Sequence, residues 1–123
     1  MQLEEVVSLI YGKVLTTGVD LKAEVEGGCG ADLMSDVLAS VQPQAVLLTG
    51  LCNPQVVRTA QMADVAAIVF VRGKMPTQDM IDLANEEKIP LIMTPYGMFE
   101  LCGRLYKAGL PSLERRIASD QDD

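Results

Sequence analysis

Three uninterrupted apolar runs, each followed by a short polar loop and a segment with helical spacing, most constrain what this chain can fold into. The apolar runs span residues 45–48, 66–71 and 91–93. Strands that are apolar along their whole length are typical of sheets covered on both faces. The helices predicted after them span residues 54–62, 77–87 and 95–108. These crossovers are long enough for right-handed parallel pairing, so the sequence predicts an α/β layered fold with a mainly parallel sheet flanked by helices.

Proline stands at the start of each of these helices, at Pro54, Pro76 and Pro95. Asn53 and Thr94 precede two of the prolines, and Asn or Thr followed by Pro is typical of an N-cap and first helical position. We therefore predict that Asn53 and Thr94 cap their helices, and that Gly109 ends the last helix. An internal duplication would also give this repetition, but the loops share little else, so three βα units that obey one capping rule are favoured.

The first forty or so residues follow a different pattern. The spacing of apolar residues predicts a helix over residues 3–10, followed by short strands at 14–16 and 22–26. Residues 27–30, which are mostly glycine, are predicted to form a loop. Asp32 is predicted to cap a helix that faces the core. The apolar positions of that helix are Leu33, Met34, Val37, Leu38 and Val41.

The length of the chain bounds its organisation. With 123 residues, 49% of them hydrophobic, it can form one domain with one core. We assign residues 1–111 to this domain and residues 112–123 to an acidic C-terminal tail. The last five residues, from Ser119 to Asp123, include three acids and nothing to bury, so we expect them to be a frayed end.

The net charge of −7 limits the partners of the chain. A field of this sign repels nucleic-acid phosphates and anionic lipid headgroups, so we expect neither nucleic acid nor a membrane as partner. The longest run without charges, residues 37–57, contains prolines and glutamines that a membrane-spanning helix would not carry together. The first residues are acidic, unlike the basic start of a secretion signal, so we expect a soluble, cytoplasmic protein.

Loops at the carboxyl ends of parallel strands meet at one edge of the sheet, where ligands bind in folds of this type. Here the three loops span residues 49–54, 72–76 and 94–97. Each offers backbone N–H groups near a helix start, and the second places two cations beside a glycine, which suits a nucleotide phosphate or another small anion. Turn glycines and solvated charges explain the same features without a ligand. The candidate ligand-binding residues are Thr49, Gly50, Asn53, Arg72, Gly73, Lys74, Thr94 and Tyr96.

The sequence contains no catalytic motif of a familiar type. Gly12-Lys13 and Gly73-Lys74 lack the upstream glycine and the following Ser or Thr of a P-loop, which argues against ATP-driven phosphotransfer. The chain has no histidine and no G-x-S-x-G motif, so a hydrolase would need an unusual site. We predict no catalytic residue, no metal site and no cofactor.

Two other sets of residues have a functional and a structural interpretation. Cys29, Cys52 and Cys102 form no C-x-x-C pair and are expected to be reduced thiols. Cys52 precedes a predicted helix start, which favours a thiolate, but no base accompanies it and a residue that fills a loop is the favoured interpretation. Asp32 and Asp36 lie one helical turn apart and suit a water-bridged Mg²⁺, although a helix cap and a surface acid explain them better.

Four stretches match a known family in order and spacing. They are AVLLTG at 45–50, IVFVRG at 68–73, PTQDMIDLA at 76–84 and IPLIMTPY at 89–96. Through them, residues 3–110 resemble the DRTGG domain, which is related to the N-terminal domain of HPr kinase/phosphorylase and occurs beside CBS domains in some regulatory inorganic pyrophosphatases. The stretches ADLMSDVLA at 31–39 and YGMFELCG at 96–103 resemble a stand-alone, single-domain branch of that family.

The motif that gives the family its name is not conserved in this chain. Where the family often has Gly-Asp-Arg, the chain has Gly50-Leu51-Cys52, and where Thr-Gly-Gly follows the second core strand it has Arg72-Gly73-Lys74. A ligand bound through those polar residues in other members would therefore be different here, or absent. The resemblance implies a layered α/β fold, frequent dimerisation, no catalytic activity of its own, and a regulatory or ligand-sensing role.

These observations predict a non-catalytic regulatory module, a homodimer, that binds a small anionic ligand, a nucleotide or phosphometabolite, at the loop edge. The first alternative is a ligand-free subunit for protein–protein interaction or dimerisation, which would use an apolar surface. The residues considered for that surface are Met34, Met62, Met75, Met80, Met98 and Phe99. Their spacing with Leu and Val is more typical of core residues. An enzyme that uses Cys52 or the Asp32 and Asp36 pair is the third alternative.

Overall fold

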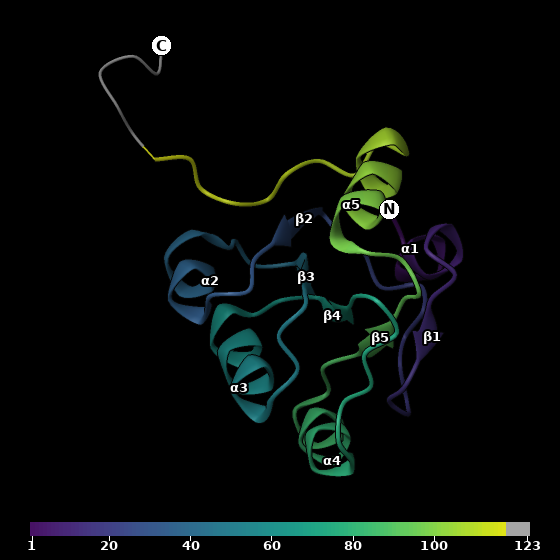
Figure 1. Cartoon of the computed structure of the whole chain (residues 1–123), viewed down its shortest axis with the longest axis vertical. Helices are drawn as coiled ribbons and strands as arrows, with labels where there is room; N and C mark the ends of the chain where they lie inside the picture. The colour runs from purple at the N-terminus through teal and green to yellow at the C-terminus, as the bar shows by residue number, and fades with distance from the viewer. Residues whose placement is uncertain (118–123) are drawn as a thin grey trace.

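The computed structural model describes residues 1–117 (Figure 1). The helices are α1 (Leu3–Leu9), α2 (Met34–Ser40), α3 (Pro54–Ala63), α4 (Gln78–Glu87) and α5 (Met98–Lys107). The strands are β1 (Lys13–Val14), β2 (Gly27–Gly30), β3 (Ala45–Thr49), β4 (Ala67–Phe70) and β5 (Leu91–Met93). They form one sheet in the order β1-β5-β4-β3-β2. Neighbours from β2 to β5 run parallel and only β1 is antiparallel to its neighbour, so the prediction of a mainly parallel α/β sheet is confirmed.

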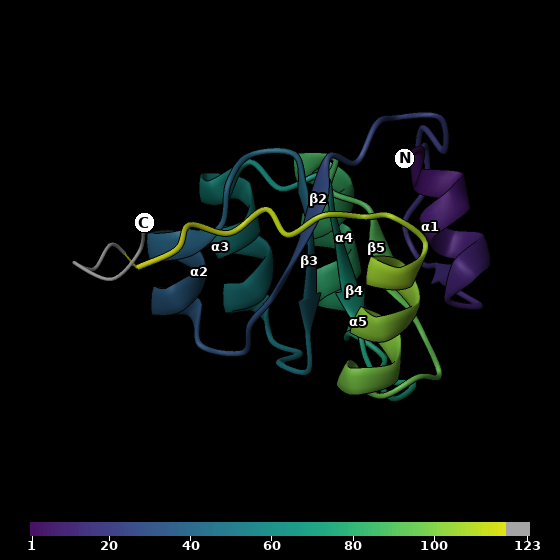
Figure 2. The same cartoon turned by 90° about the horizontal axis from the view of Figure 1, so that it is seen from above.

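The sheet is covered on both faces (Figure 2). On one face, Leu47, Ile68 and Phe70 pack against residues of α2, α3 and α4. On the other, Val46 and Val69 pack against residues of α1 and α5. Every residue of β3 and β4 is buried. Successive side chains of a strand point to opposite faces, so a strand covered on both sides needs apolar residues along its length, and the only polar residue of β3 and β4 is Thr49 at the end of β3.

The edge strand β2 lies where the sequence predicts a loop, and the strand predicted at residues 22–26 is wrong. Gly27 lies so close to the C-terminal segment that a Cβ atom on it would stand 2.6 Å from Leu113 Cβ and 2.7 Å from the carbonyl oxygen of Pro111. Glycine is common in loops because it is flexible, but here it is needed because another stretch of backbone passes within reach. Local propensity alone does not reveal that contact.

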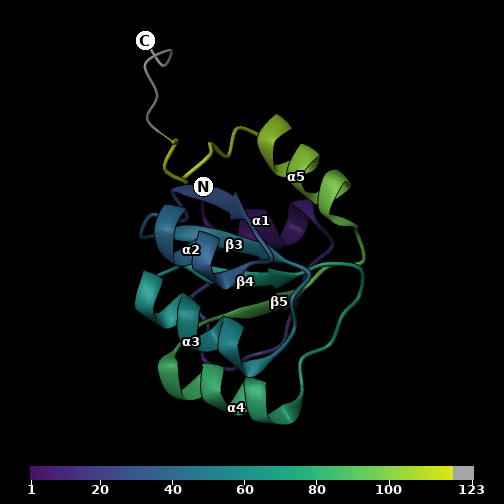
Figure 3. The same ribbon diagram turned by 60° about the vertical axis from the view of Figure 1, so that its left-hand side comes forward.

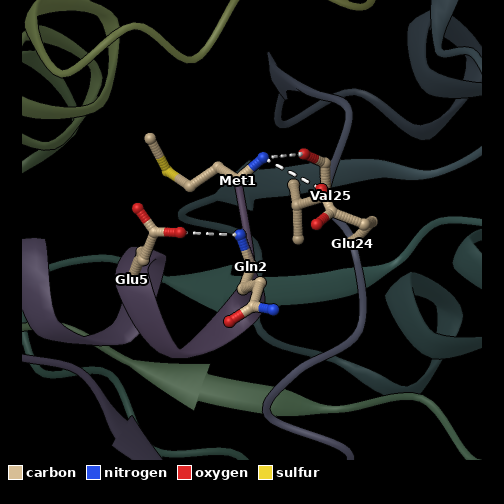
Figure 4. Close-up of polar contacts among 5 residues, drawn as sticks. All are labelled: Met1, Gln2, Glu5, Glu24 and Val25. Carbon is tan, nitrogen blue, oxygen red and sulfur yellow. Dashed lines mark hydrogen bonds and ion pairs between the residues drawn. The ribbon is translucent and has the colours of Figure 1, made fainter.

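The segment before β2 is held by α1 instead of joining the sheet (Figure 4). The Met1 ammonium donates to the Glu24 carboxylate at 3.1 Å and to the carbonyl oxygen of Val25 at 3.4 Å. The backbone N–H of Gln2 donates to the Glu5 carboxylate at 3.2 Å, at the start of α1. The chain around Glu24 is therefore extended, as the alternating pattern of residues 22–26 suggests. It pairs with the first residues of the chain and not with a strand of the sheet.

The C-terminal segment after α5 crosses the edge of the sheet beside β2 (Figure 3). The N–H of Gly28 donates to the carbonyl of Pro111 at 2.8 Å, and the N–H of Leu113 donates to the carbonyl of Gly28 at 2.9 Å. Gly109 has a φ of +103°, the left-handed region that glycine favours, as predicted for the end of α5. The boundary at residue 111 stays a prediction, and the predicted frayed end, residues 119–123, lies outside the described residues.

Of the two predicted N-caps, one is confirmed and one is wrong. The Asn53 side chain accepts from the N–H of Val56, and Pro54 is the first residue of α3. Helix α5 begins at Met98 with Gly97 as its N-cap, and not after Thr94. The Thr94 hydroxyl is buried and donates to the carbonyl of Ile10 at 2.7 Å. A buried hydroxyl needs a partner, and the end of α1 provides a carbonyl that the helix itself leaves unpaired.

The prediction that Asp32 caps α2 is also wrong. The N-cap of α2 is Leu33, with no side-chain cap, and the Asp32 carboxylate bonds to β3 and the loop after it. Helix α2 has one fully covered position, Val37, while Leu33 and Leu38 are 61% and 51% exposed. This short helix lies at the edge of the sheet, so only its inner side meets the core.

Gly27→Ala is expected to lower the free energy of unfolding by about 1–3 kcal/mol, the usual cost of overpacking, because the added Cβ meets backbone that cannot rotate away. Urea unfolding followed by circular dichroism measures this. Gly28→Ala in the same strand is the control, since its Cβ would stand 3.4 Å from the flexible Leu110 side chain. Equal stability of the two variants would contradict the close approach at Gly27.

Candidate functional site

The three loops after β3, β4 and β5 meet at one edge of the sheet, as the sequence predicts. The N–H groups of Arg72 and Gly73 each donate at 2.8 Å, to the carbonyls of Tyr96 and Thr94. The Lys74 ammonium reaches the first loop and donates to the carbonyl of Gly50 at 2.6 Å. The structure therefore brings together, through backbone contacts, residues from each of the predicted loops.

The middle loop presents two cations from an unusual backbone. Arg72 and Gly73 have φ values of +60° and +68°, both in the left-handed region. A residue other than glycine seldom adopts this region, and Arg72 is held there by the bonds to the loop after β5. The side chains of Arg72 and Lys74 are exposed. The tight turn thus directs two positive charges to the loop edge of a chain with a net charge of −7.

Two of the predicted ligand residues use their side chains inside the protein. Thr49 and Thr94 are fully buried. The Thr49 hydroxyl donates to Asp32 at 3.1 Å and accepts from the N–H of Leu51 at 3.1 Å. The Thr94 hydroxyl donates to α1 and accepts from the N–H of Tyr96 at 3.3 Å. These threonines shape the loops, and the Asn53 side chain is used to cap α3.

Asp32 is the residue of this edge that the sequence analysis did not assign to it. One carboxylate oxygen, Oδ1, accepts from the N–H of Gly50 at 2.7 Å and from the hydroxyl of Thr49 at 3.1 Å. Asp32 follows β2 by two residues, the position at which polar residues reach the loop edge. This position of Asp32, just after a strand, could be recognised from the sequence only if residues 27–30 were first identified as a strand.

Tyr96 connects the loop edge to α5. The guanidinium of Arg104 lies 4.3 Å from the centre of its ring, and the ring of Tyr11 lies 6.0 Å away. Arg104 also donates to Glu100 at 2.9 Å along the helix. A cation over an aromatic face is held electrostatically. Tyr96 therefore contacts both Arg104 and Tyr11, and Arg104 is a second residue that the sequence analysis did not connect with this region.

The surroundings of the three cysteines favour the protonated thiol over the thiolate. Burial raises the pKa of the Cys52 thiol, although the nearby Lys74 ammonium lowers it in part. Burial and the Glu114 carboxylate raise the pKa of Cys29 to about 12, and the same two causes raise that of Cys102. A thiol must lose its proton to act as a nucleophile, so these shifts oppose a catalytic role for Cys52.

Alkylation of Cys52 by iodoacetamide is expected to be slow at pH 8 and to rise with pH beyond the range of an ordinary thiol, because its raised pKa keeps it protonated. Lys74→Met should slow it further, since the variant removes the charge that lowers the pKa. Peptide mass spectrometry after timed labelling follows each cysteine separately. A faster reaction in Lys74→Met would show that the ammonium does not stabilise the thiolate.

The described residues hold no group of three or more His, Cys, Asp or Glu side chains placed to bind a metal ion. Nor does any helix within residues 1–117 have the length and apolar character needed to cross a membrane. A cavity of about 530 Å³ lies at the opposite end of the sheet, before β4 and β5, between the loop of residues 16–20 and the end of α4. Its position is unrelated to the predicted ligand residues.

A small, mainly parallel sheet covered by helices on both faces defines the class of the protein, which is a layered α/β domain. The chain belongs to the DRTGG domain family, whose model matches residues 5–108, nearly the whole chain. The family resemblance noted from the sequence is confirmed.

A solved structure shares this fold. The CBS and DRTGG domains of the regulatory region of Clostridium perfringens pyrophosphatase, complexed with the activator diadenosine tetraphosphate, match with a TM-score of 0.73 at 15% sequence identity. The match covers 99% of this chain and 55% of that chain, so the present chain corresponds to about half of the regulatory region. A search of curated proteins found no match.

Proposed function

We propose that this chain is a non-catalytic regulatory module that binds a small anionic ligand, a nucleotide or phosphometabolite, at the loop edge of the sheet. The observation that carries the proposal is the placement of Arg72 and Lys74, exposed and from one tight turn, over the loops after β3 and β5. The ligand site would comprise these two side chains, while the predicted residues Gly50 and Gly73 would shape it, because their N–H groups are bonded to Asp32 and to the carbonyl of Thr94. Thr49, Asn53, Thr94 and Tyr96 would hold the loops in place.

The charge of the chain makes this placement informative. The chain has ten Lys and Arg residues and 17 Asp and Glu residues, so it is negatively charged overall. Two cations on one short turn therefore form a locally positive region. An anion is repelled by most of the surface and attracted to this edge, which favours a specific site over general adsorption. The relative in which a DRTGG domain is part of a nucleotide-activated regulatory region supports a nucleotide as the first ligand to test.

A regulatory role without catalysis agrees with the chemistry of the side chains. The sequence has no histidine, and the raised pKa of each cysteine keeps the thiols protonated near neutral pH.

The test is thermal unfolding with and without a panel of adenine nucleotides, other nucleotides and phosphorylated metabolites. A ligand that binds only the folded state, at about 100 times its Kd, adds about 2.7 kcal/mol and raises the Tm by several degrees. Arg72→Ala should remove the shift. Lys22→Ala, an exposed cation beside the cavity at the opposite end of the sheet, is the matched control and should keep it. No shift with any compound would contradict the proposal.

A second candidate function, dimerisation, is favoured by the groove between α1 and α5. Phe99 is 95% exposed there. The groove has two parts of about 630 and 510 Å³ that share Leu9 and Ala108. Glu4 and Glu5 of α1 line one part. Arg104 and Lys107 of α5 line the other, together with Glu100, which is paired with Arg104, so that Lys107 is the base without this partner. A surface with acids along one helix and bases along its neighbour is complementary to itself, so a second copy related by a two-fold axis would pair α1 with α5 twice.

Phe99→Asp is expected to convert a dimer to a monomer, because a charge would replace the most exposed aromatic side chain of the groove. Light scattering after size-exclusion chromatography measures the mass. Met62→Asp is the control, since Met62 is 65% exposed on α3, in the other layer. A dimer that survives Phe99→Asp but not Met62→Asp would place the interface elsewhere, and a monomeric wild-type chain would remove this candidate.

A further inference from the structure

Gly50 lies between two opposite charges at the loop edge. A Cβ atom on this residue would stand 3.5 Å from the Lys74 ammonium and 3.6 Å from both oxygens of the Asp32 carboxylate. The two charges therefore flank the space above the glycine. Among the described residues, no ion pair joins Asp32 to Lys74, so the space between them is not closed by a direct contact. We call Asp32, Gly50 and Lys74 the charged bracket.

Both charged groups of the bracket keep unused hydrogen-bonding capacity. Asp32 uses Oδ1 for Gly50 and Thr49, and within residues 1–117 no hydrogen bond is formed by its other oxygen, Oδ2. The Lys74 ammonium has three N–H groups and uses one of them on the carbonyl of Gly50. An acceptor and a donor of full charge are thus presented side by side, both held by bonds to the same glycine.

We propose that the charged bracket makes the loop edge selective for phosphate esters that carry a hydroxyl or amino group, such as nucleotides and sugar phosphates, over bare inorganic anions. A hydroxyl or amino group of the ligand donates to Oδ2 of Asp32, while its phosphate accepts from Lys74 and Arg72. This proposal rests on the proposed function, and it adds Asp32 as the residue that determines specificity.

The physical reason is the fixed position of the Asp32 charge. The carboxylate is held at the loop edge by two hydrogen bonds, so it cannot turn away from a ligand. A fully ionised inorganic anion such as sulfate has only acceptors at the bracket, and it meets this carboxylate with like charge and no donor. A ligand with a donor replaces that repulsion with a charge-assisted hydrogen bond, which is among the stronger contacts available at a protein surface.

Asp32→Asn tests the role of the charge without removing the internal contacts. The amide oxygen of Asn can still accept from Gly50 and Thr49, so the loop keeps its bonds, while the charge at Oδ2 is replaced by an amide N–H that donates. Binding of adenosine monophosphate and ribose 5-phosphate should weaken about tenfold or more, the range of one hydrogen bond to a charged group. Binding of sulfate, which has no donor, should strengthen.

Gly50→Ala tests whether the ligand occupies the space between the charges of Asp32 and Lys74. The added methyl would meet Lys74 and Asp32 at ordinary contact distances, so the fold should persist while the methyl occupies the position between the two charges. We expect it to weaken nucleotide binding at least as much as Asp32→Asn does. Gly103→Ala, where a Cβ meets nothing within 4 Å, is the control for a glycine-to-alanine change and should bind as the wild type does.

Isothermal titration of the four proteins with adenosine monophosphate, ribose 5-phosphate and sulfate completes the test. Support requires that wild type prefers the two hydroxyl-bearing esters to sulfate by about tenfold and loses this preference in Asp32→Asn. Wild type that binds sulfate equally well, or a preference that persists in Asp32→Asn, overturns the inference and leaves the anion site intact. Wild type that binds none of these probes overturns the inference, and the wider ligand panel then decides the proposed function.

Discussion

The carboxylate of Asp32 holds the end of β2 to the loop that follows β3, and the geometry of the loop edge depends on this contact. One oxygen accepts from the Thr49 hydroxyl and from the Gly50 N–H, which orients the peptide groups on both sides of Gly50. The carbonyl of the same glycine accepts from Lys74, which ties the turn after β4 to it. Through the backbone bonds of Arg72 and Gly73, that turn holds the loop after β5. Parallel strands align their ends, but side-chain bonds are needed to fix the loops beyond them.

Much of the fold could be predicted because the central strands obey a simple constraint. Residues such as Val46, Leu47, Ile68 and Val69 must be apolar, since both faces of β3 and β4 are covered by helices. The same argument gives the parallel order, because each apolar run is followed by a helix long enough to cross over. Asn53 and Pro54 could also be interpreted correctly, since a cap is a local interaction between residues three apart.

The errors share one cause, which is contact between residues far apart in the sequence. Gly27 belongs to a strand because it pairs with Ala45 of β3, and it is glycine because the C-terminal segment, more than eighty residues later, lies against it. Thr94 looks like a cap in its own sequence context, but its hydroxyl is taken by the carbonyl of Ile10. Asp32 precedes a helix and bonds to β3 instead. Asp, Thr and Gly have strong local preferences that tertiary bonds can replace, and so their roles are the hardest to assign from the sequence.

Tyr96 links the loop edge to the groove between α1 and α5, so the two candidate sites are physically continuous. Its carbonyl accepts from the N–H of Arg72, which belongs to the cationic turn, and its ring lies under the guanidinium of Arg104, which lines the groove. A ligand at the loop edge can alter the groove only if it favours one arrangement of these contacts over another, because an effector shifts an equilibrium by no more than its difference in affinity for the two states. Arg72 is the natural place for such a difference, since its left-handed backbone is held by the bond to Tyr96 and its side chain stands at the proposed anion site. A single aromatic residue, Tyr96, therefore connects the proposed ligand site with the groove that would form the dimer.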